Sequence, residues 1–281
     1  AFSQAMSRFE GAKVVLWEST YDRILPGVAR RHGFRVVALP HNLESLGTPD
    51  TPAVEATADR LANEASRLGA ADAIFTIARE EQWLLAGLGL ASHYLPYFPP
   101  SDVVGPLRQV RERRRTAAKP RSVLILGNAL HPPTAVGMTT ALHDVLPALP
   151  PGWQIAIAGF GSEKLTVPTD DRITVHGPVT PTQLESLLVS AAVLLTHQRR
   201  GAGALTRIPE SLVAGLPVLA NPIAARSTSG LEGVYVYETA AELGQLLRTP
   251  LPMPSEPSEP ASCYAQFHHT LRTTADAAGR V

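Results

Sequence analysis

Continuous apolar runs alternate with amphipathic stretches along nearly all of the 281 residues, and this alternation constrains the fold more than any other feature. Apolar runs of about five residues are typical of strands buried on both faces, and the stretches between them are typical of helices that cover a sheet. This succession predicts an α/β fold of doubly wound parallel sheets. In the first half we expect strands at 13–17, 35–39 and 73–77 and helices at 22–32, 52–68 and 79–88.

The alternation breaks once and then resumes. Residues 99–120 open on prolines and carry an arginine cluster at 111–115, which favours an inter-domain connection with a solvated basic helix. Further on, residues 180–183 read Thr-Pro-Thr-Gln, a capping box that predicts the start of a helix. In the second half we expect strands at 122–126, 154–158, 173–175, 192–195, 218–219 and 234–236, a helix at 134–149, a loop at 251–260 and a closing helix at 261–278.

These elements predict two Rossmann-like domains of unequal size. The N-terminal one, at 1–100, is expected to be partial, because only about three strands are clear where such sheets usually have five or six. A linker at 101–120 leads to a complete domain at 121–250, followed by a Pro- and Ser-rich linker with a C-terminal helix at 251–281. Residue 1 is Ala and not Met, so we expect either a processed chain or a fragment.

Charge and composition exclude some classes of function. The 25 Lys and Arg residues balance 25 Asp and Glu residues, which argues against broad nucleic-acid binding because that needs a basic surface. The one cysteine, Cys263, leaves no partner for an internal disulfide. We see neither a secretory leader nor an apolar run long enough to span a bilayer, so a cytoplasmic protein is expected. Only the arginine cluster would favour a membrane surface.

The chemistry is concentrated in one stretch of the second half, where a loop with Gly201 and Gly203 leads into a short helix. Glycines permit close backbone approach to a ligand. Thr206 is expected to cap the helix, whose free N–H groups would form an anion site beside Arg207. Glu210 lies one turn further on the same side. The pattern suits a sugar nucleotide, with its phosphates at the helix tip and its ribose hydroxyls at the carboxylate.

Structural roles for the same residues stay open. Glu210 would also favour the helix macrodipole, Arg207 could be a surface cation, and Gly215 is most simply a helix C-cap. No Asp-x-Asp pair occurs in the sequence, so we expect no metal that bridges a diphosphate.

Several motifs follow one another in a characteristic order. They are I-L-G-N at 125–128, I-A-I-A-G-F-G at 155–161, V-H-G-P-V at 175–179, R-I-P-E-S-L-V-A-G-L-P-V at 207–218 and, in the first half, P-H-N-L-E-S at 40–45 and A-D-A-I-F-T-I-A-R-E-E at 71–81. Together they resemble GT-B glycosyltransferases, especially family 4. The resemblance implies two Rossmann-like domains that face each other across a cleft, the N-terminal one incomplete here.

The resemblance also implies an activity. Such enzymes transfer a hexose from a nucleoside-diphosphate sugar to a hydroxyl acceptor, here expected to be a saccharide, a lipid-linked molecule or a small molecule, with retention of configuration and without a metal or other cofactor. His41 would contact the sugar, Arg207 the leaving diphosphate and Glu210 the ribose. The other expected substrate-binding residues are Asn42, Gly127, Asn128, Gly159, Gly161, Arg200, Gly201, Gly203 and Thr206.

Three departures from the family pattern keep alternatives open. Ala202 stands where the first of two family glutamates is expected, and residues 128–131 hold neither the Arg nor the Lys found there in many members. The family's amino-terminal strand and glycine-rich loop also have no counterpart in this sequence. A non-catalytic homologue or fragment that binds a nucleotide sugar is one alternative, and a nucleotide-sugar 2-epimerase is another.

Overall fold

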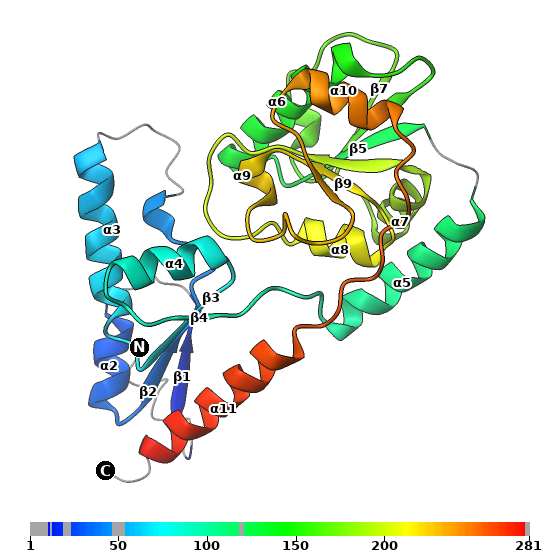
Figure 1. Ribbon diagram of the computed structural model, residues 1–281. Coiled ribbons are helices and arrows are strands. Elements are labelled where there is room, and N and C mark those ends of the chain that lie inside the picture. The colour runs from blue at the N-terminus through cyan, green and yellow to red at the C-terminus, as the bar shows by residue number, and fades with distance from the viewer. Residues whose placement is uncertain (1–10, 12, 19–23, 47–53, 118–120, 279–281) are drawn as a thin grey trace. The chain divides into compact units, whose positions relative to one another are not determined.

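The computed structural model describes residues 11, 13–18, 24–46, 54–117 and 121–278 (Figure 1). The chain forms two compact units, and each is described here by itself. The first unit comprises Ala1–Pro96, Ala202–Ala204 and Glu259–Val281, and the second comprises Tyr97–Gly201 and Leu205–Ser258. Ala1, residues 22–23 and residues 52–53, on which parts of the sequence predictions fall, lie outside the described residues.

The first unit is built on a four-stranded parallel sheet. Its strands, in the spatial order β1-β2-β3-β4, are β1 (Val14–Trp17), β2 (Arg35–Ala38), β3 (Ala73–Thr76) and β4 (His93–Tyr94). Its helices are α2 (Leu25–Arg31), the 3-10 turn η1 (Glu44–Leu46), α3 (Val54–Leu68), α4 (Arg79–Gly87) and α11 (Ala261–Ala278). The strand β4 is missing from the sequence predictions because two residues carry no periodicity.

The core of the first unit explains where its polar loop lies. Trp17, Val36 and Leu85 are buried in one apolar cluster that joins the sheet to its helices. The chain leaves β2 at Ala38 and turns at once into the segment that begins with His41. This segment therefore lies at the carboxyl edge of the sheet, which is the ligand-binding edge of open α/β sheets.

The second unit is built on a six-stranded parallel sheet. In the spatial order β10-β9-β8-β5-β6-β7, its strands are β10 (Val234–Val236), β9 (Val218–Ala220), β8 (Val193–Thr196), β5 (Ser122–Leu126), β6 (Gln154–Ala158) and β7 (Ile173–Gly177). The chain runs outward from β5 to β7 and then returns to build β8 to β10 on the other side. This is the doubly wound Rossmann order, and its direction reverses between β5 and β8.

Helices cover both faces of this second sheet. They are α5 (Ser101–Thr116), α6 (Pro132–Ala148), the 3-10 turn η2 (Ser162–Lys164), α7 (Pro181–Ser190), α8 (Arg207–Val213), α9 (Pro222–Ala225) and α10 (Ala240–Arg248). Alternate strand residues belong to two separate cores: Val123 packs with α6 and α10, whereas Leu124 packs with α5, α7, α8 and α9. The predicted capping box of α7 is confirmed, since Thr180 and Gln183 bond each other reciprocally.

The prediction of a solvated basic face on α5 is wrong at two arginines. Arg111 is buried, and its guanidinium donates to the carbonyls of Leu212 at 2.5 Å, Val213 at 2.8 Å and Pro254 at 2.8 Å. Arg114 donates to carbonyls at the end of α7 and just after α8, and burial lowers its pKa to about 10. The last carbonyls of a helix lack partners within the helix, so these arginines satisfy them.

The C-terminal part of the chain follows its predictions. Residues 251–260 have no regular structure, and α11 spans the predicted 261–278. The helices α9 and α10 were missed; α9 has only four residues. None of the helices in the described part of the chain combines the length and the apolar composition needed to cross a bilayer.

Candidate functional site

The candidate site lies at the carboxyl edge of the second sheet, where β5 and β8 are neighbours. Gly127 follows β5, Thr196 ends β8, and the loop after β8 leads to Arg207 at the start of α8. In doubly wound sheets the crossover helices diverge at this point, so ligands bind there. The fold therefore brings together, at this one edge, three residues that lie up to 80 positions apart in the sequence.

Arg207 is a cation that the described part of the chain leaves without a carboxylate at ion-pair distance. Its Nε and Nη2 donate to the hydroxyl of the buried Thr196 at 3.2 and 3.0 Å. Within the described ranges no acid lies at ion-pair distance from it. Burial lowers the pKa of Arg207 to about 10, so the guanidinium is still charged at neutral pH. A partly desolvated cation of this kind is suited to bind an anion.

Glu210 lies in the first turn of α8, and its carboxylate is already engaged on one side. The Tyr97 hydroxyl donates to Glu210 Oε1 at 2.7 Å. Burial raises the pKa of Glu210, while the Tyr97 hydrogen bond and the charge of Arg207 oppose the rise. Tyr97 was missed by sequence reasoning, because it lies 113 residues from Glu210 and only the fold brings the two together.

The expectation that Thr206 caps α8 is wrong. Thr206 has helical backbone angles, φ −57° and ψ −31°, and its side chain makes no capping hydrogen bond. A capping residue needs an extended backbone so that its side chain can turn back to the helix. The Ile208 N–H bonds the Leu205 carbonyl instead, which begins the turn one residue earlier. The positive charge at this site therefore comes from the Arg207 guanidinium and not from a capped helix tip.

Two of the predicted glycines allow backbones to meet at this edge. A Cβ on Gly127 would lie 2.7 Å from the Thr134 methyl and 3.7 Å from Arg207 Nη1. Gly159 has φ +121°, and a Cβ there would lie 2.0 Å from the Gly127 carbonyl oxygen. A side chain at Gly127 would fill the space beside Arg207, and one at Gly159 would push β5 and β6 apart.

Gly161 and Asn128 shape the adjoining loop. Gly161 has φ +78°, and a Cβ there would lie 2.9 Å from the Leu130 nitrogen. The exposed Asn128 accepts a hydrogen bond from the same Leu130 N–H through Oδ1, at 3.0 Å. These contacts give both residues a local structural role.

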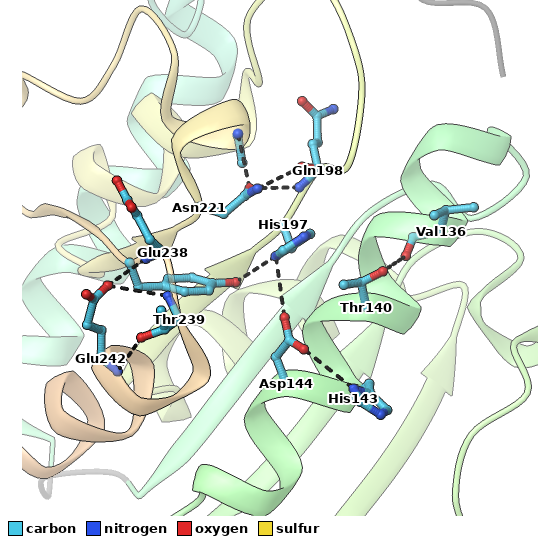
Figure 2. A network of polar contacts seen from close by, with 12 residues as sticks. Val136, Thr140, His143, Asp144, His197, Gln198, Asn221, Glu238, Thr239 and Glu242 are labelled. Atoms are coloured by element: carbon cyan, nitrogen blue, oxygen red, sulfur yellow. Dashed lines mark hydrogen bonds and ion pairs between the residues drawn. The ribbon is translucent and has the colours of Figure 1, made fainter. Parts of the chain in front are cut away.

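The loop after β8 carries Arg200 and Gly201. Arg200 is exposed, while Gly201 has φ +154° and a Cβ there would lie 3.1 Å from Gln198 Oε1. Gln198 is buried and exchanges hydrogen bonds with Asn221, the residue that caps α9 (Figure 2). Arg226 Nη2 also donates to Gln198 Oε1, at 2.9 Å. The loop is thus held at its base by amide contacts.

A second polar group at this edge was missed by sequence reasoning. His197, which follows Thr196, lies with Nδ1 3.0 Å from the Tyr237 hydroxyl and 3.8 Å from the Asp144 carboxylate of α6 (Figure 2). Burial lowers the pKa of His197, and Asp144 opposes the shift. Burial also raises the pKa of Tyr237. The His197 side chain therefore links the end of β8 to the residue after β10 by a hydrogen bond and lies within ion-pair distance of α6.

In the first unit, the fold brings together His41, Asn42 and Gly203. Gly203 has φ +72°, and a Cβ there would lie 2.7 Å from the His41 carbonyl oxygen and 3.1 Å from Asn42 Cβ. The Gly203 N–H donates to Glu81 Oε1 at 2.5 Å, and Glu81 also accepts from the Leu43 N–H. Glu81 is buried and was not predicted as a site residue.

The side chain of His41 is open to solvent. It is 73% exposed, and its Nε2 lies 3.9 Å from a carboxylate oxygen of Glu18. Most of the ring surface is therefore accessible to solvent. Within the described ranges no three His, Cys, Asp or Glu side chains are grouped as metal ligands would be.

Comparison with known proteins gives similarity of structure only. No protein-family model and no curated protein matches the sequence. Sucrose-phosphate synthase from Thermosynechococcus elongatus matches with a TM-score of 0.63 at 15% identity, over 98% of this chain and 72% of its own. A UDP-forming α,α-trehalose-phosphate synthase from Burkholderia vietnamiensis matches with a TM-score of 0.68 at 10% identity, over 98% and 75%.

A third solved structure, HepE from Anabaena in complex with UDP, matches with a TM-score of 0.62 at 12% identity, over 99% of this chain and 74% of its own. At these identities the likeness concerns the fold. The α/β arrangement of a smaller N-terminal unit and a Rossmann-ordered second unit agrees with that likeness. The chain has the fold of the GT-B glycosyltransferases.

Proposed function

We propose that the protein transfers a hexose from a nucleoside-diphosphate sugar to a hydroxyl acceptor, with retention of configuration and without a metal. The observation that carries this proposal is Arg207 at the β5–β8 switch point, a partly desolvated cation that forms no ion pair with an acid of the described residues. A diphosphate supplies the anion that this cation lacks. The neighbour HepE was solved in complexes with UDP and with UDP-glucose, which supports a nucleotide sugar as the ligand.

In the proposed reaction, the bond between the anomeric carbon and the β-phosphate oxygen breaks while the acceptor oxygen bonds to that carbon. Negative charge grows on the departing diphosphate, and its β-phosphate oxygen takes the proton that the acceptor hydroxyl loses. Arg207 stabilises that charge, because its guanidinium is held by Thr196 before the reaction begins. Glu210 accepts hydrogen bonds from the ribose hydroxyls.

The remaining predicted contacts stay part of the proposal. His41, Asn42 and Gly203 would contact the sugar, and Gly127, Gly159 and Gly161 would leave room for the nucleotide. Asn128, Arg200, Gly201 and Thr206 are further proposed contacts. The acceptor class and a cytoplasmic setting stay predictions from the sequence.

The test is a donor screen with the purified chain. UDP- and GDP-hexoses are incubated with simple hydroxyl acceptors, and release of the nucleoside diphosphate is measured with and without EDTA. We expect release with one donor, insensitive to EDTA, and a loss of about 100-fold in Arg207→Ala. Arg113→Ala, on the exposed side of α5, is the matched control and should keep the wild-type rate. Equal rates in wild type and Arg207→Ala would refute the assignment.

A second candidate function is a subunit that binds the donor and does not transfer the sugar. Ala202 favours it, because this position is expected to carry a glutamate in family 4 enzymes. Saturable binding of a nucleoside diphosphate, together with no turnover of any UDP- or GDP-hexose, would establish this alternative.

A further inference from the structure

We propose that Tyr97 is a positioning residue that holds the Glu210 carboxylate away from Arg207, so that the cation stays available to a diphosphate and the second carboxylate oxygen to a ribose. This inference rests on the proposed function and deepens it. The second unit lacks an ion pair that the spacing of two charged residues would allow. Arg207 and Glu210 lie at i and i+3 of α8, a spacing at which opposite charges can pair, yet they form no ion pair.

The hydroxyl of Tyr97 accounts for this absence. It donates to Glu210 Oε1 at 2.7 Å, and this hydrogen bond fixes the carboxylate by one of its two oxygens. A carboxylate has about four acceptor positions, so Oε2 keeps its capacity for further donors. A hydrogen bond to a charged acceptor is stronger than one between neutral groups, so it competes well with a partly exposed ion pair.

The segment that carries Tyr97 is itself held on α8. Tyr97 lies four residues before α5, and Arg111 of α5 donates to the carbonyls of Leu212 and Val213 at the end of α8. The first turn and the last turn of α8 are therefore tied to the same stretch of chain. A tyrosine has only two side-chain torsions, so a hydroxyl on this frame is placed with little freedom.

Without the Tyr97 hydroxyl, the nearest strong partner for Glu210 is the guanidinium one turn away. An ion pair between them would neutralise the charge that the diphosphate needs and occupy the oxygens that the ribose needs. Removing one hydroxyl should therefore weaken recognition of two parts of the nucleotide, although Tyr97 itself contacts neither in this proposal.

The test measures ribose recognition in Tyr97→Phe. UDP and GDP are titrated into the wild-type chain by calorimetry, and the one that binds is compared with its 2′,3′-dideoxy analogue. We expect the wild type to prefer the ribonucleotide about 10-fold or more, as for hydrogen bonds to a charged group. In Tyr97→Phe the preference should fall to about 3-fold or less, with weaker binding of both ligands. Tyr235→Phe, on β10, is the matched control and should behave as wild type.

A double-mutant cycle shows whether Tyr97 acts through Glu210. Glu210→Ala should lose the ribose preference, and adding Tyr97→Phe to it should change nothing further. A ribose preference that survives in Tyr97→Phe but is lost in Glu210→Ala would overturn the role of Tyr97 and leave the proposed function intact. A wild-type preference unaffected by Glu210→Ala would also overturn it. If the wild type binds neither UDP nor GDP, the proposed function fails, and this inference fails with it.

Discussion

At the scale of single residues, Arg207 carries a charge that burial disfavours in the ligand-free protein but that can bind an anion. Burial lowers its pKa to about 10, which means that the surroundings disfavour the charged form relative to water. Thr196 compensates only partly, because one neutral hydroxyl accepts from two of its nitrogens. Such a residue should stabilise a bound anion more than it stabilises the fold.

Replacing Arg207 with methionine should therefore separate binding from stability. Met fills similar space without a charge, so we expect the unfolding free energy of the ligand-free chain to stay equal or to rise by about 1 kcal/mol. Affinity for a nucleoside diphosphate should fall by at least about 10-fold. Urea titration measures the first quantity and calorimetry the second. A clear loss of stability with binding retained would make Arg207 a structural cation.

His197 should give the fold a pH dependence. Its pKa in the folded protein is lowered by burial, whereas in the unfolded chain it should lie near its ordinary value of about 6.5. Between these two pKa values the unfolded state binds more protons than the folded state. The free energy of unfolding is therefore not reduced by His197 above about pH 6.5, and it decreases as the pH falls toward the folded pKa. Asp144 limits the loss, since it favours the protonated ring.

The measurement is the free energy of unfolding between pH 7 and pH 5, compared between wild type and His197→Asn. The decline with falling pH should be smaller in the variant, by about 1.4 kcal/mol for each unit by which the two pKa values differ. Tyr237 should not contribute to this change, because burial raises its pKa further from this range. Equal slopes in the two proteins would show that His197 does not titrate on unfolding.

Sequence reasoning at this scale reached residues whose type and spacing carry the chemistry, such as Arg207 and Glu210. It did not reach Tyr97, His197 or Glu81, because their partners come from other elements of the fold. The Thr206 cap failed for a different reason: backbone angles decide whether a side chain caps a helix, and these depend on the preceding loop.

At the scale of elements, α8 is a short helix whose position depends on its neighbours. It has seven residues, too few to be stable alone, and its apolar face is buried against the second sheet. Its final carbonyls take their hydrogen bonds from Arg111, a residue 101 positions away from Leu212. The position of α8 thus depends on α5, and Tyr97, four residues before α5, bonds Glu210.

Arg111→Ala should accordingly be among the most destabilising substitutions in the second unit. It removes donors from three buried carbonyls, so we expect a loss of about 3–5 kcal/mol in unfolding free energy. Arg113→Ala, two residues along the same helix and exposed, should cost less than about 1 kcal/mol. Chemical denaturation of both variants makes the comparison. Equal effects would mean that α8 is held in place by apolar packing alone.

The buried strands were the most predictable elements. Their predicted bounds agree with the structure to within one or two residues, because a continuous apolar run ends where burial ends. The solvated face predicted for α5 failed at Arg111 and Arg114, since an arginine sequence does not reveal which cations meet free carbonyls. Short elements such as β4 and α9 were not predicted, because two to four residues are too few to show a hydrophobic periodicity.

At the scale of the whole molecule, the alternation of strands and helices predicted the α/β class, and the structure confirms it. It did not predict that the last helix, α11, belongs to the first unit. This helix has no fully buried residue, and Phe267 contacts the ring of Phe75 edge-on at 5.0 Å between centroids. Gln266 adds a hydrogen bond to His93.

Phe267→Ala should loosen α11 and expose Phe75. We expect a loss of about 1–3 kcal/mol in the stability of the first unit, which is below the cost for a fully buried aromatic. Hydrogen exchange should accelerate in β1 to β4, while β5 to β10 in the second unit serve as an internal control. Unchanged exchange in the first sheet would mean that α11 contributes little to its stability.

Arg207, held by Thr196 at the β5–β8 switch point, should bind the diphosphate of a nucleotide. The decisive measurement is titration calorimetry of this chain with UDP and with GDP. We expect saturable, one-to-one binding of at least one of them, weakened by about 10-fold or more in Arg207→Ala and unchanged in Arg113→Ala. No binding of either nucleotide, or equal affinity in wild type and Arg207→Ala, would contradict it.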